Sequence, residues 1–193
     1  FTMTDPKPEA WKDRDKKYGE FEIVGEDQRL THLWVIDVES KKTRRLTKGN
    51  FTVGGFDWSP DGKAIAFDHT LNGDPSNSGT GDISVVTVAD AAIRPLVTQA
   101  GPDRSPRWSP DGARIAFSSA MAQPFYYYTN SRIAVVPAAG GVPRRLTYHP
   151  AVDEVVGWTP DGKGIIFRSG RLSFAGIPRL FTVGLEGGFP EEL

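Results

Sequence analysis

The pentapeptide Trp58-Ser59-Pro60-Asp61-Gly62 recurs along the chain at a fixed interval. The second copy is Trp108-Ser109-Pro110-Asp111-Gly112 and the third is Trp158-Thr159-Pro160-Asp161-Gly162, so the tryptophans stand 50 residues apart. Each copy leads into a short apolar run that ends in a phenylalanine. Self-similarity at a constant period of this length is typical of a repeat architecture.

Each repeat contains enough sequence for four β-strands. A leucine lies 12 residues before each repeated tryptophan, at Leu46, Leu96 and Leu146. A run rich in β-branched and aromatic residues, which favour strands, precedes each of these leucines. A fourth such run lies at the corresponding position of the last repeat. They are residues 33–38, 83–88, 133–136 and 180–183. We therefore expect strand A to end at the tryptophan, strand B at the phenylalanine, strand C to cover this run, and strand D to end near the leucine.

A tight turn is expected between strands A and B. Serine or threonine at its first position, proline at its second and glycine at its fourth match the preferences of a type I turn. The proline fixes φ, and the hydroxyl or the aspartate can bond nearby amides.

These features predict an all-β protein built of β-propeller blades, each with four antiparallel strands. The ring is expected to be incomplete, with three full blades and part of a fourth. A single partial propeller, 1–193, is divided into an incomplete blade with a long loop (1–50) and blades at 51–100, 101–150 and 151–193.

Both ends of the chain are expected to fall inside a blade. Phe1 aligns with the phenylalanines that end strand B, and residues 187–193 align with residues 140–146 at the end of strand D. An unclosed arc exposes faces and strand edges that closure would cover. The arc is therefore expected to be completed by further blades or by self-association.

Composition disfavours several kinds of partner. The 193 residues include 23 Lys and Arg against 24 Asp and Glu, a net charge of -1 that predicts neither nucleic-acid nor membrane binding. No apolar run approaches the roughly 20 residues of a membrane span. The absence of cysteine excludes disulfides and thiolate metal sites. Composition does not decide the cellular compartment, and we slightly favour the cytoplasm over the periplasm.

A search for catalytic chemistry predicts no catalytic, cofactor-binding or metal-binding residue. A serine hydrolase of the α/β type needs a Gly-x-Ser-x-Gly elbow, which the sequence lacks. The three histidines, His32, His69 and His149, lie far apart in sequence and beside expected strands. We expect them to be structural or exposed.

Two loops could hold a ligand. Asp68, Asn72, Asp74 and Asp82 bracket the Gly- and Ser-rich loop 73–81, but their spacing fits neither an EF-hand nor a P-loop. We therefore expect a flexible loop there. In the next blade Phe125-Tyr126-Tyr127-Tyr128 could line a peptide-binding surface or pack against a neighbouring blade.

Two groups of charged residues stand out in the remaining sequence. Arg168, Arg171 and Arg179 flank the loop 169–178 and could pair with a carboxylate. The mixed-charge run 12–17 is expected to be a solvated loop.

The repeats resemble the amino-terminal propeller of prolyl oligopeptidase family serine peptidases. The resemblance is carried by the three pentapeptides with their Ile-Ala-Phe-like runs, by residues 33–37 and by Arg45-Leu46-Thr47. Residues 2–9 and 51–58 are similar to stretches of the acylaminoacyl and dipeptidyl peptidase branch. Residues 167–169, 179–183 and 187–188 look more like the propeller of tricorn-type proteases, and Tol-type propellers share the repeat.

This resemblance implies that the chain has a non-catalytic role. In such peptidases the propeller caps a separate α/β-hydrolase domain, absent from this chain, and admits short peptides. No catalytic residue can be carried over, and Glu191-Glu192 falls in strand D, so it is not the glutamate pair that anchors substrates in the dipeptidyl branch. The alternatives are a Tol-like or tricorn-like protein-binding scaffold, or an excised or composite propeller unit that assembles with its own copies.

Overall fold

The structure, a computed structural model, describes residues 1–21, 23, 25–26, 28–123, 130–171 and 177–193. These residues form four antiparallel sheets that follow one another along the chain. Sheet 1 contains β1 (Thr2–Thr4), β2 (Thr31–Ile36) and β3 (Thr43–Arg45). Sheet 2 contains β4 (Phe51–Trp58), β5 (Ala64–Leu71), β6 (Asp82–Thr87) and β7 (Ile93–Val97). Sheet 3 contains β8 (Asp103–Trp108), β9 (Arg114–Ser119), β10 (Arg132–Pro137) and β11 (Arg144–Arg145), and sheet 4 contains β12 (Asp153–Trp158), β13 (Gly164–Ser169), β14 (Arg179–Gly184) and β15 (Glu191–Glu192).

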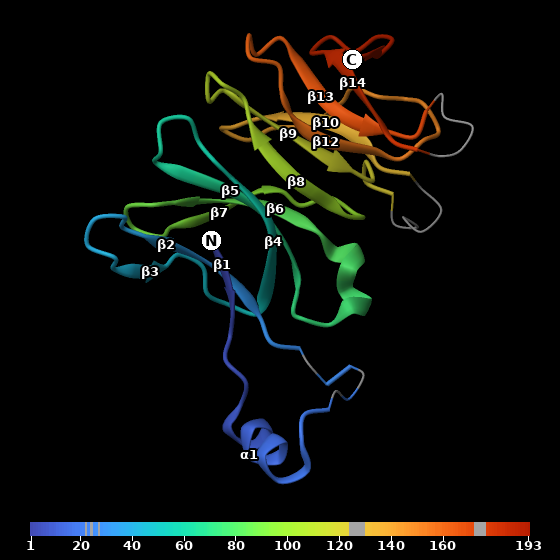
Figure 1. Cartoon of the computed structure of the whole chain (residues 1–193). Helices are drawn as coiled ribbons and strands as arrows, with labels where there is room; N and C mark the ends of the chain where they lie inside the picture. The colour runs from blue at the N-terminus through green and yellow to red at the C-terminus, as the bar shows by residue number, and fades with distance from the viewer. Residues whose placement is uncertain (22, 24, 27, 124–129, 172–176) are drawn as a thin grey trace.

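The four sheets are arranged as a fan in chain order (Figure 1). The first strands of sheets 2, 3 and 4 contact one another, β4 with β8 and β8 with β12, and so form the inner side of the fan. In the described residues, sheet 1 has no counterpart of these inner strands, because β1 occupies the place of strand B. The prediction of an all-β, incomplete propeller is confirmed.

The repeated pentapeptide closes the turn between the first two strands of each full blade. Ser59 Oγ donates to Asp61 Oδ1 over 2.7 Å and accepts the backbone N–H of Ala64 over 2.9 Å. The Gly62 N–H donates to the Ser59 carbonyl over 2.9 Å, and Gly62 has a φ of +69°, which glycine adopts without strain. The same bonds recur in the other two copies. The geometry of this turn therefore explains why the Ser or Thr, the Asp and the Gly of the motif are repeated.

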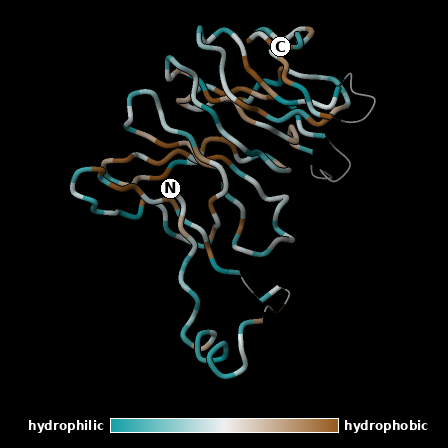
Figure 2. The backbone as a smooth tube through the Cα atoms, in the orientation of Figure 1, coloured by the Kyte–Doolittle hydropathy of each residue, from teal (hydrophilic) through white to brown (hydrophobic). Residues whose placement is uncertain are grey.

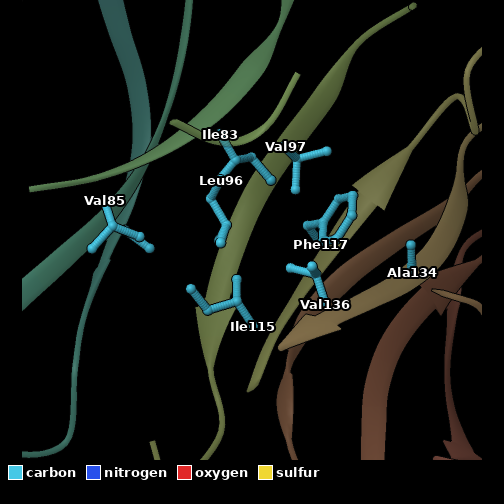
Figure 3. Packing of buried hydrophobic residues seen from close by; sticks show 9 residues of the cluster. Ile83, Val85, Leu96, Val97, Ile115, Phe117, Ala134 and Val136 are labelled. Carbon is cyan, nitrogen blue, oxygen red and sulfur yellow. The ribbon is translucent and has the colours of Figure 1, made fainter. Parts of the chain in front are cut away.

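Apolar side chains fill the space between successive sheets. Figure 2 shows the hydrophobic stretches on strands inside the fan, while the segment around α1 is hydrophilic. Between sheets 2 and 3, Ile83, Val85 and Leu96 belong to the same cluster as Ile115 and Phe117 (Figure 3). Equivalent clusters join sheets 1 and 2 and sheets 3 and 4. Burial of these faces is the main source of stability in a stack of repeats.

A repeated arginine links the outer edges of the sheets. Arg44, Arg94 and Arg144 stand 50 residues apart. Each donates to a backbone carbonyl in the turn between the last two strands of the next sheet; the acceptors are Val88, Ala138 and Leu185. We call this series the arginine ladder. It was not predicted from the sequence, although its period equals that of the tryptophans.

The prediction of a loop at residues 12–17 is wrong, because this run lies in helix α1 (Glu9–Tyr18). Glu9 in the first turn and Lys16 and Lys17 in the last turn complement the helix dipole. Pairs three residues apart, such as Lys12 with Glu9, add to its stability. The helix buries no residue, so its expected exposure to solvent is confirmed. Among the described helices, none is long and apolar enough to cross a membrane.

Candidate functional site

A hollow of about 550 Å³ opens between sheets 3 and 4, where their inner strands begin. Its lining combines four small polar residues, four apolar side chains and three charged groups. The lining residues are Pro102, Arg104, Ser105, Ser118, Ala120, Asn130, Ser131, Val152, Glu154, Val155 and Arg168. Its size is within the range of small-ligand sites.

The charged groups of this hollow are partly engaged within the chain. Arg168 Nε donates to Glu154 Oε2 over 3.0 Å, and both side chains are about half exposed. Arg104 donates to the backbone carbonyl of Ser78. Arg104 also borders a second hollow of about 270 Å³ on the sheet 2 side. A guanidinium carries five N–H donors, so Arg104 keeps capacity for an acceptor in either hollow.

Asp68 fixes the backbone beside Arg104. Its Oδ1 accepts the N–H of Gly55 over 3.1 Å, and its Oδ2 accepts the N–H of Ser105 over 2.8 Å, which joins sheet 2 to sheet 3. A Cβ at Gly54 would lie 2.2 Å from Asp68 Oδ1, so this close approach requires glycine. Burial raises the pKa of Asp68, although the two N–H bonds favour its charged form. We call the hydrogen bond from the Ser105 N–H to Asp68, which joins the two sheets, the inner clamp.

Between sheets 3 and 4, a serine accepts the backbone N–H that joins the two sheets, as Asp68 does between sheets 2 and 3. Ser118, which follows Phe117 as Asp68 follows Phe67, accepts the N–H of Val155 over 2.9 Å. Ser131 donates to the carbonyl of Asp153 over 2.8 Å. The hydroxyls of Ser118 and Ser131 in the wall of the hollow therefore both bond to backbone groups.

The histidines occupy three different environments. His32 is fully buried, its Nδ1 lies 3.2 Å from Thr47 Oγ1, and burial lowers its pKa. His69 Nε2 lies 2.9 Å from Ser84 Oγ, a contact that was not predicted from the sequence. Ser84 is only 3% exposed, so its hydroxyl is not accessible to a substrate in this structure. His32 and His69 both contact the ring of Phe51, at centroid distances of 5.5 and 4.9 Å, while His149 is exposed on the surface.

The loop after β5 contains a 3₁₀ helix, η1 (Pro75–Thr80), which the expectation of a simple flexible loop did not include. Asp74 caps it by accepting the Ser76 N–H over 2.9 Å. Asn72 accepts the Asp74 N–H and the Asn77 side-chain amide over 2.9 and 2.8 Å. Asp68, Asn72 and Asp74 line the smaller hollow together. Within the described ranges, no group of three or more histidine or acidic side chains could hold a metal ion.

All three candidate arginines pair with carboxylates of the chain itself. Arg171 and Asp153 form a buried pair, in which Arg171 Nη2 lies 2.8 and 2.7 Å from the two carboxylate oxygens. Arg168 pairs with Glu154, and Arg179 pairs with Glu192 over 2.8 Å. The aromatic cluster 125–128 lies outside the described residues.

Asp103 occupies the position of Asp153 one blade earlier, but the position of Arg171 is taken by Met121. Asp103 is fully buried, and its Oδ1 accepts Gln99 Nε2 over 2.9 Å. Its Oδ2 has no hydrogen-bond partner among the described residues. Burial raises the pKa of Asp103 to about 6, despite hydrogen bonds from Ser119 and Gln99 that favour the carboxylate.

The Asp103→Asn variant is therefore expected to be more stable than the parent at about pH 7.5, by about 2–3 kcal/mol at about 1.4 kcal/mol per pKa unit. The pKa of Asp103 is higher in the folded chain than its ordinary 3.8. The folded chain therefore binds a proton more tightly, and the parent gains stability as the pH falls through about 6. Urea unfolding of both proteins at several pH values should show the difference shrinking towards zero near pH 4. A variant that is no more stable than the parent at neutral pH would contradict this interpretation.

Comparison with known proteins identifies the propeller. The family model of the tricorn protease N-terminal β-propeller domain matches residues 78–193. The chain belongs to this family. The match includes the carboxy-terminal stretches whose sequence resembles tricorn-type proteases. Curated protein sequences give no match.

Solved structures share the fold of this tricorn-type propeller. TolB from Acinetobacter baumannii aligns over 84% of this chain and 37% of its own, with a TM-score of 0.66 and 21% identity. A puromycin-hydrolyzing peptidase from Mycobacterium tuberculosis aligns over 87% of this chain and 26% of its own, with a TM-score of 0.62 and 21% identity. Oligogalacturonate lyase from Vibrio parahaemolyticus aligns over 81% of this chain and 42% of its own, with a TM-score of 0.57 and 16% identity. The chain therefore spans between about a quarter and two fifths of the length of these proteins.

Proposed function

We propose that this chain is the non-catalytic propeller portion of a serine peptidase of the prolyl oligopeptidase class, in the acylaminoacyl and dipeptidyl branch. In this proposal it covers an α/β-hydrolase domain outside residues 1–193 and restricts entry to short peptides. The observation that carries it is membership of a propeller family named for a protease. The commitment of Ser118 and Ser131 to backbone groups is consistent with a supporting role.

The proposal assigns the hollow beside Arg104 to the path of the peptide. A short peptide carries a carboxylate at one end and an amine at the other. Arg104 and the Glu154–Arg168 pair offer both signs of charge at one opening. Opposite charges on an opening orient a charged ligand as it approaches.

The first test is the reading frame after residue 193. We expect it to encode a Gly-x-Ser-x-Gly elbow and, further on, an acid and a histidine. A frame that continues without this elbow would end the proposal.

The second test measures gating in the complete enzyme. Deleting the propeller is expected to raise cleavage of an unfolded protein relative to a dipeptidyl substrate, because long chains would gain access to the hydrolase. The matched control replaces only Arg104 with Ala and should change the Michaelis constant for charged short peptides without admitting long chains. An unchanged ratio after deletion of a propeller from a folded hydrolase would refute gating.

A protein-binding scaffold is the second candidate function. The similarity to TolB in fold, at a TM-score of 0.66, favours it. The two functions predict different genes, because a peptidase needs a hydrolase domain downstream of the propeller and a scaffold does not. A downstream peptidase domain would exclude the scaffold, and its absence together with capture of a folded protein partner would support it.

A further inference from the structure

Sheets 3 and 4 each begin their inner strand with a buried aspartate, and the two aspartates differ in their partners. At the interface between sheets 3 and 4, Arg171 binds both carboxylate oxygens of Asp153. The positive charge of Arg132 also interacts with Asp153. The carboxylate of Asp153 is therefore balanced by guanidinium groups of the same interface.

At the interface between sheets 2 and 3, the two corresponding positions hold no basic residue. Met121 stands where Arg171 stands one sheet later, and the N–H of each bonds to a serine two residues earlier. Asp82 is the first residue of β6 as Arg132 is the first residue of β10, and the two stand 50 residues apart. Two positive charges are thus replaced by a neutral side chain and a second carboxyl group.

Asp103 therefore has one carboxyl oxygen without a partner among the described residues. Its side chain is fully buried, and Oδ2 accepts no hydrogen bond from that part of the chain. Oδ1 accepts the side-chain amide of Gln99 over 2.9 Å. The negative charge of Asp82 opposes ionisation of Asp103, as does burial. A neutral carboxyl group suits this site better than a carboxylate does.

The strands around β8 carry further charged and titratable side chains. In sheet 2 they are Asp57, Asp68, His69 and Asp82. In β8, β9 and β12 they are Arg104, Arg107, Arg114, Asp153 and Glu154. Arg104 and Arg107 donate to the backbone carbonyls of Ser78 and Val156. Burial lowers the pKa of His69, so this imidazole supplies no positive charge near neutral pH.

The residues that follow Asp103 form a strained bulge. Ser105 has a φ of +56°, which is unfavourable for a residue with a side chain. The register of β8 against β9 shifts between Arg104 and Arg107. The inner clamp, from the Ser105 N–H to Asp68 over 2.8 Å, holds this conformation. Asp103 thus lies beside a segment that relaxes if the interface opens.

We propose that Asp103 is a pH switch for the start of β8. While it carries its proton, Asp103 stays buried and residues 103–105 remain closed against sheet 2. When the proton leaves, the carboxylate has no positive partner in this interface and moves towards water, which opens these residues and relaxes the bulge. The opened segment includes Arg104, which borders both hollows. This inference does not rest on the proposed peptidase function.

The direction of the switch follows from proton linkage. The pKa of Asp103 is about 6 in the closed form and returns towards its ordinary 3.8 when water reaches the carboxylate. The closed form therefore binds the proton more tightly, and its advantage is full below about pH 4 and is lost as the pH rises through about 6. Burial also raises the pKa of Asp68 and of Asp82, which act in the same direction. The opening equilibrium should increase about tenfold between about pH 5 and about pH 8.

Amide hydrogen exchange between about pH 5 and about pH 8 tests the proposal, after correction for the intrinsic pH dependence of exchange. The reporters are the N–H groups of Asp103 and Ser105, which bond across to sheet 2. The internal controls are the N–H groups of Asp153 and Val155, at the equivalent positions between sheets 3 and 4. We expect the protection of the reporters to fall about tenfold over this range, while that of the controls changes by less than about twofold.

Two variants test whether the carboxyl group of Asp103 is the source of the effect. Asp103→Asn cannot ionise, so its reporters should be equally protected at both ends of the pH range. Met121→Arg supplies the guanidinium that sheet 4 has at this position and should also flatten the pH profile, because the carboxylate gains a positive partner. Met121→Leu is the matched control and should keep the pH profile of the parent.

Equal protection of the parent's reporters at both ends of the pH range would overturn the proposal. An equal loss of protection at the two interfaces would also overturn it, because ionisation would then act on the whole chain. A pH profile that survives in both Asp103→Asn and Met121→Arg would exclude Asp103 as its source. If Asp103→Asn does not fold, the comparison of Met121→Arg with Met121→Leu still decides.

Discussion

Replacing Arg171 with Met is expected to lower the free energy of unfolding by about 3–5 kcal/mol. The Arg171 side chain is 6% exposed, and its guanidinium contacts both oxygens of the fully buried Asp153 and lies over the rings of Phe167 and Phe181. Without it, the Asp153 carboxylate would stay buried without the guanidinium that contacts both its oxygens, which costs more than the pair contributes. Urea denaturation at neutral pH measures the effect.

The repeat itself supplies the control for this prediction. In sheet 2, Val53 and Leu71 occupy the positions of Asp153 and Arg171. The double variant Asp153→Val with Arg171→Leu removes both charges and should recover most of the stability lost in Arg171→Met. If Arg171→Met were as stable as the parent, the buried pair would not have the structural role given to it.

Replacing Phe117 with Ala is expected to lower the free energy of unfolding by about 3–5 kcal/mol, as for other fully buried aromatic side chains. Phe117 is fully buried and lies in the cluster between sheets 2 and 3. The loss should weaken the contact between two sheets, because the cavity opens at their interface. Thermal or urea unfolding measures it.

Phe189→Ala is the matched control, since the same ring is removed from a side chain that is 98% exposed. Its effect should stay within about 0.5 kcal/mol. Equal effects of the two substitutions would contradict the assignment of Phe117 to the core between blades.

The fold could be predicted because the repeat encodes it locally. Ser59 and Asp61 lie in one tight turn whose contacts span only a few residues, and the same contacts recur twice. Apolar runs then alternate with turns at a constant period, which suits a stack of small sheets. The helix at Glu9–Tyr18 was not predicted, because a run of alternating charges with no buried face suits a solvated loop equally well.

The candidate site was less predictable because its contacts join residues of different blades. Asp68 bonds to the N–H of Ser105, a partner 37 positions away, and nothing in either local sequence marks the pair. The sequence suggested a carboxylate partner for Arg171 but gave no sign that the partner is Asp153. The arginine ladder did have a detectable signal, because Arg44, Arg94 and Arg144 follow the period of the tryptophans.

An assay of the purified 193-residue chain with chromogenic aminoacyl and dipeptidyl substrates tests whether catalysis lies outside the propeller. We expect no turnover above the rate of the substrates alone, because the proposed function places catalysis in a domain outside residues 1–193. Saturable turnover that copurifies with the chain through several columns would contradict this assignment, and would require a catalytic site within the propeller itself.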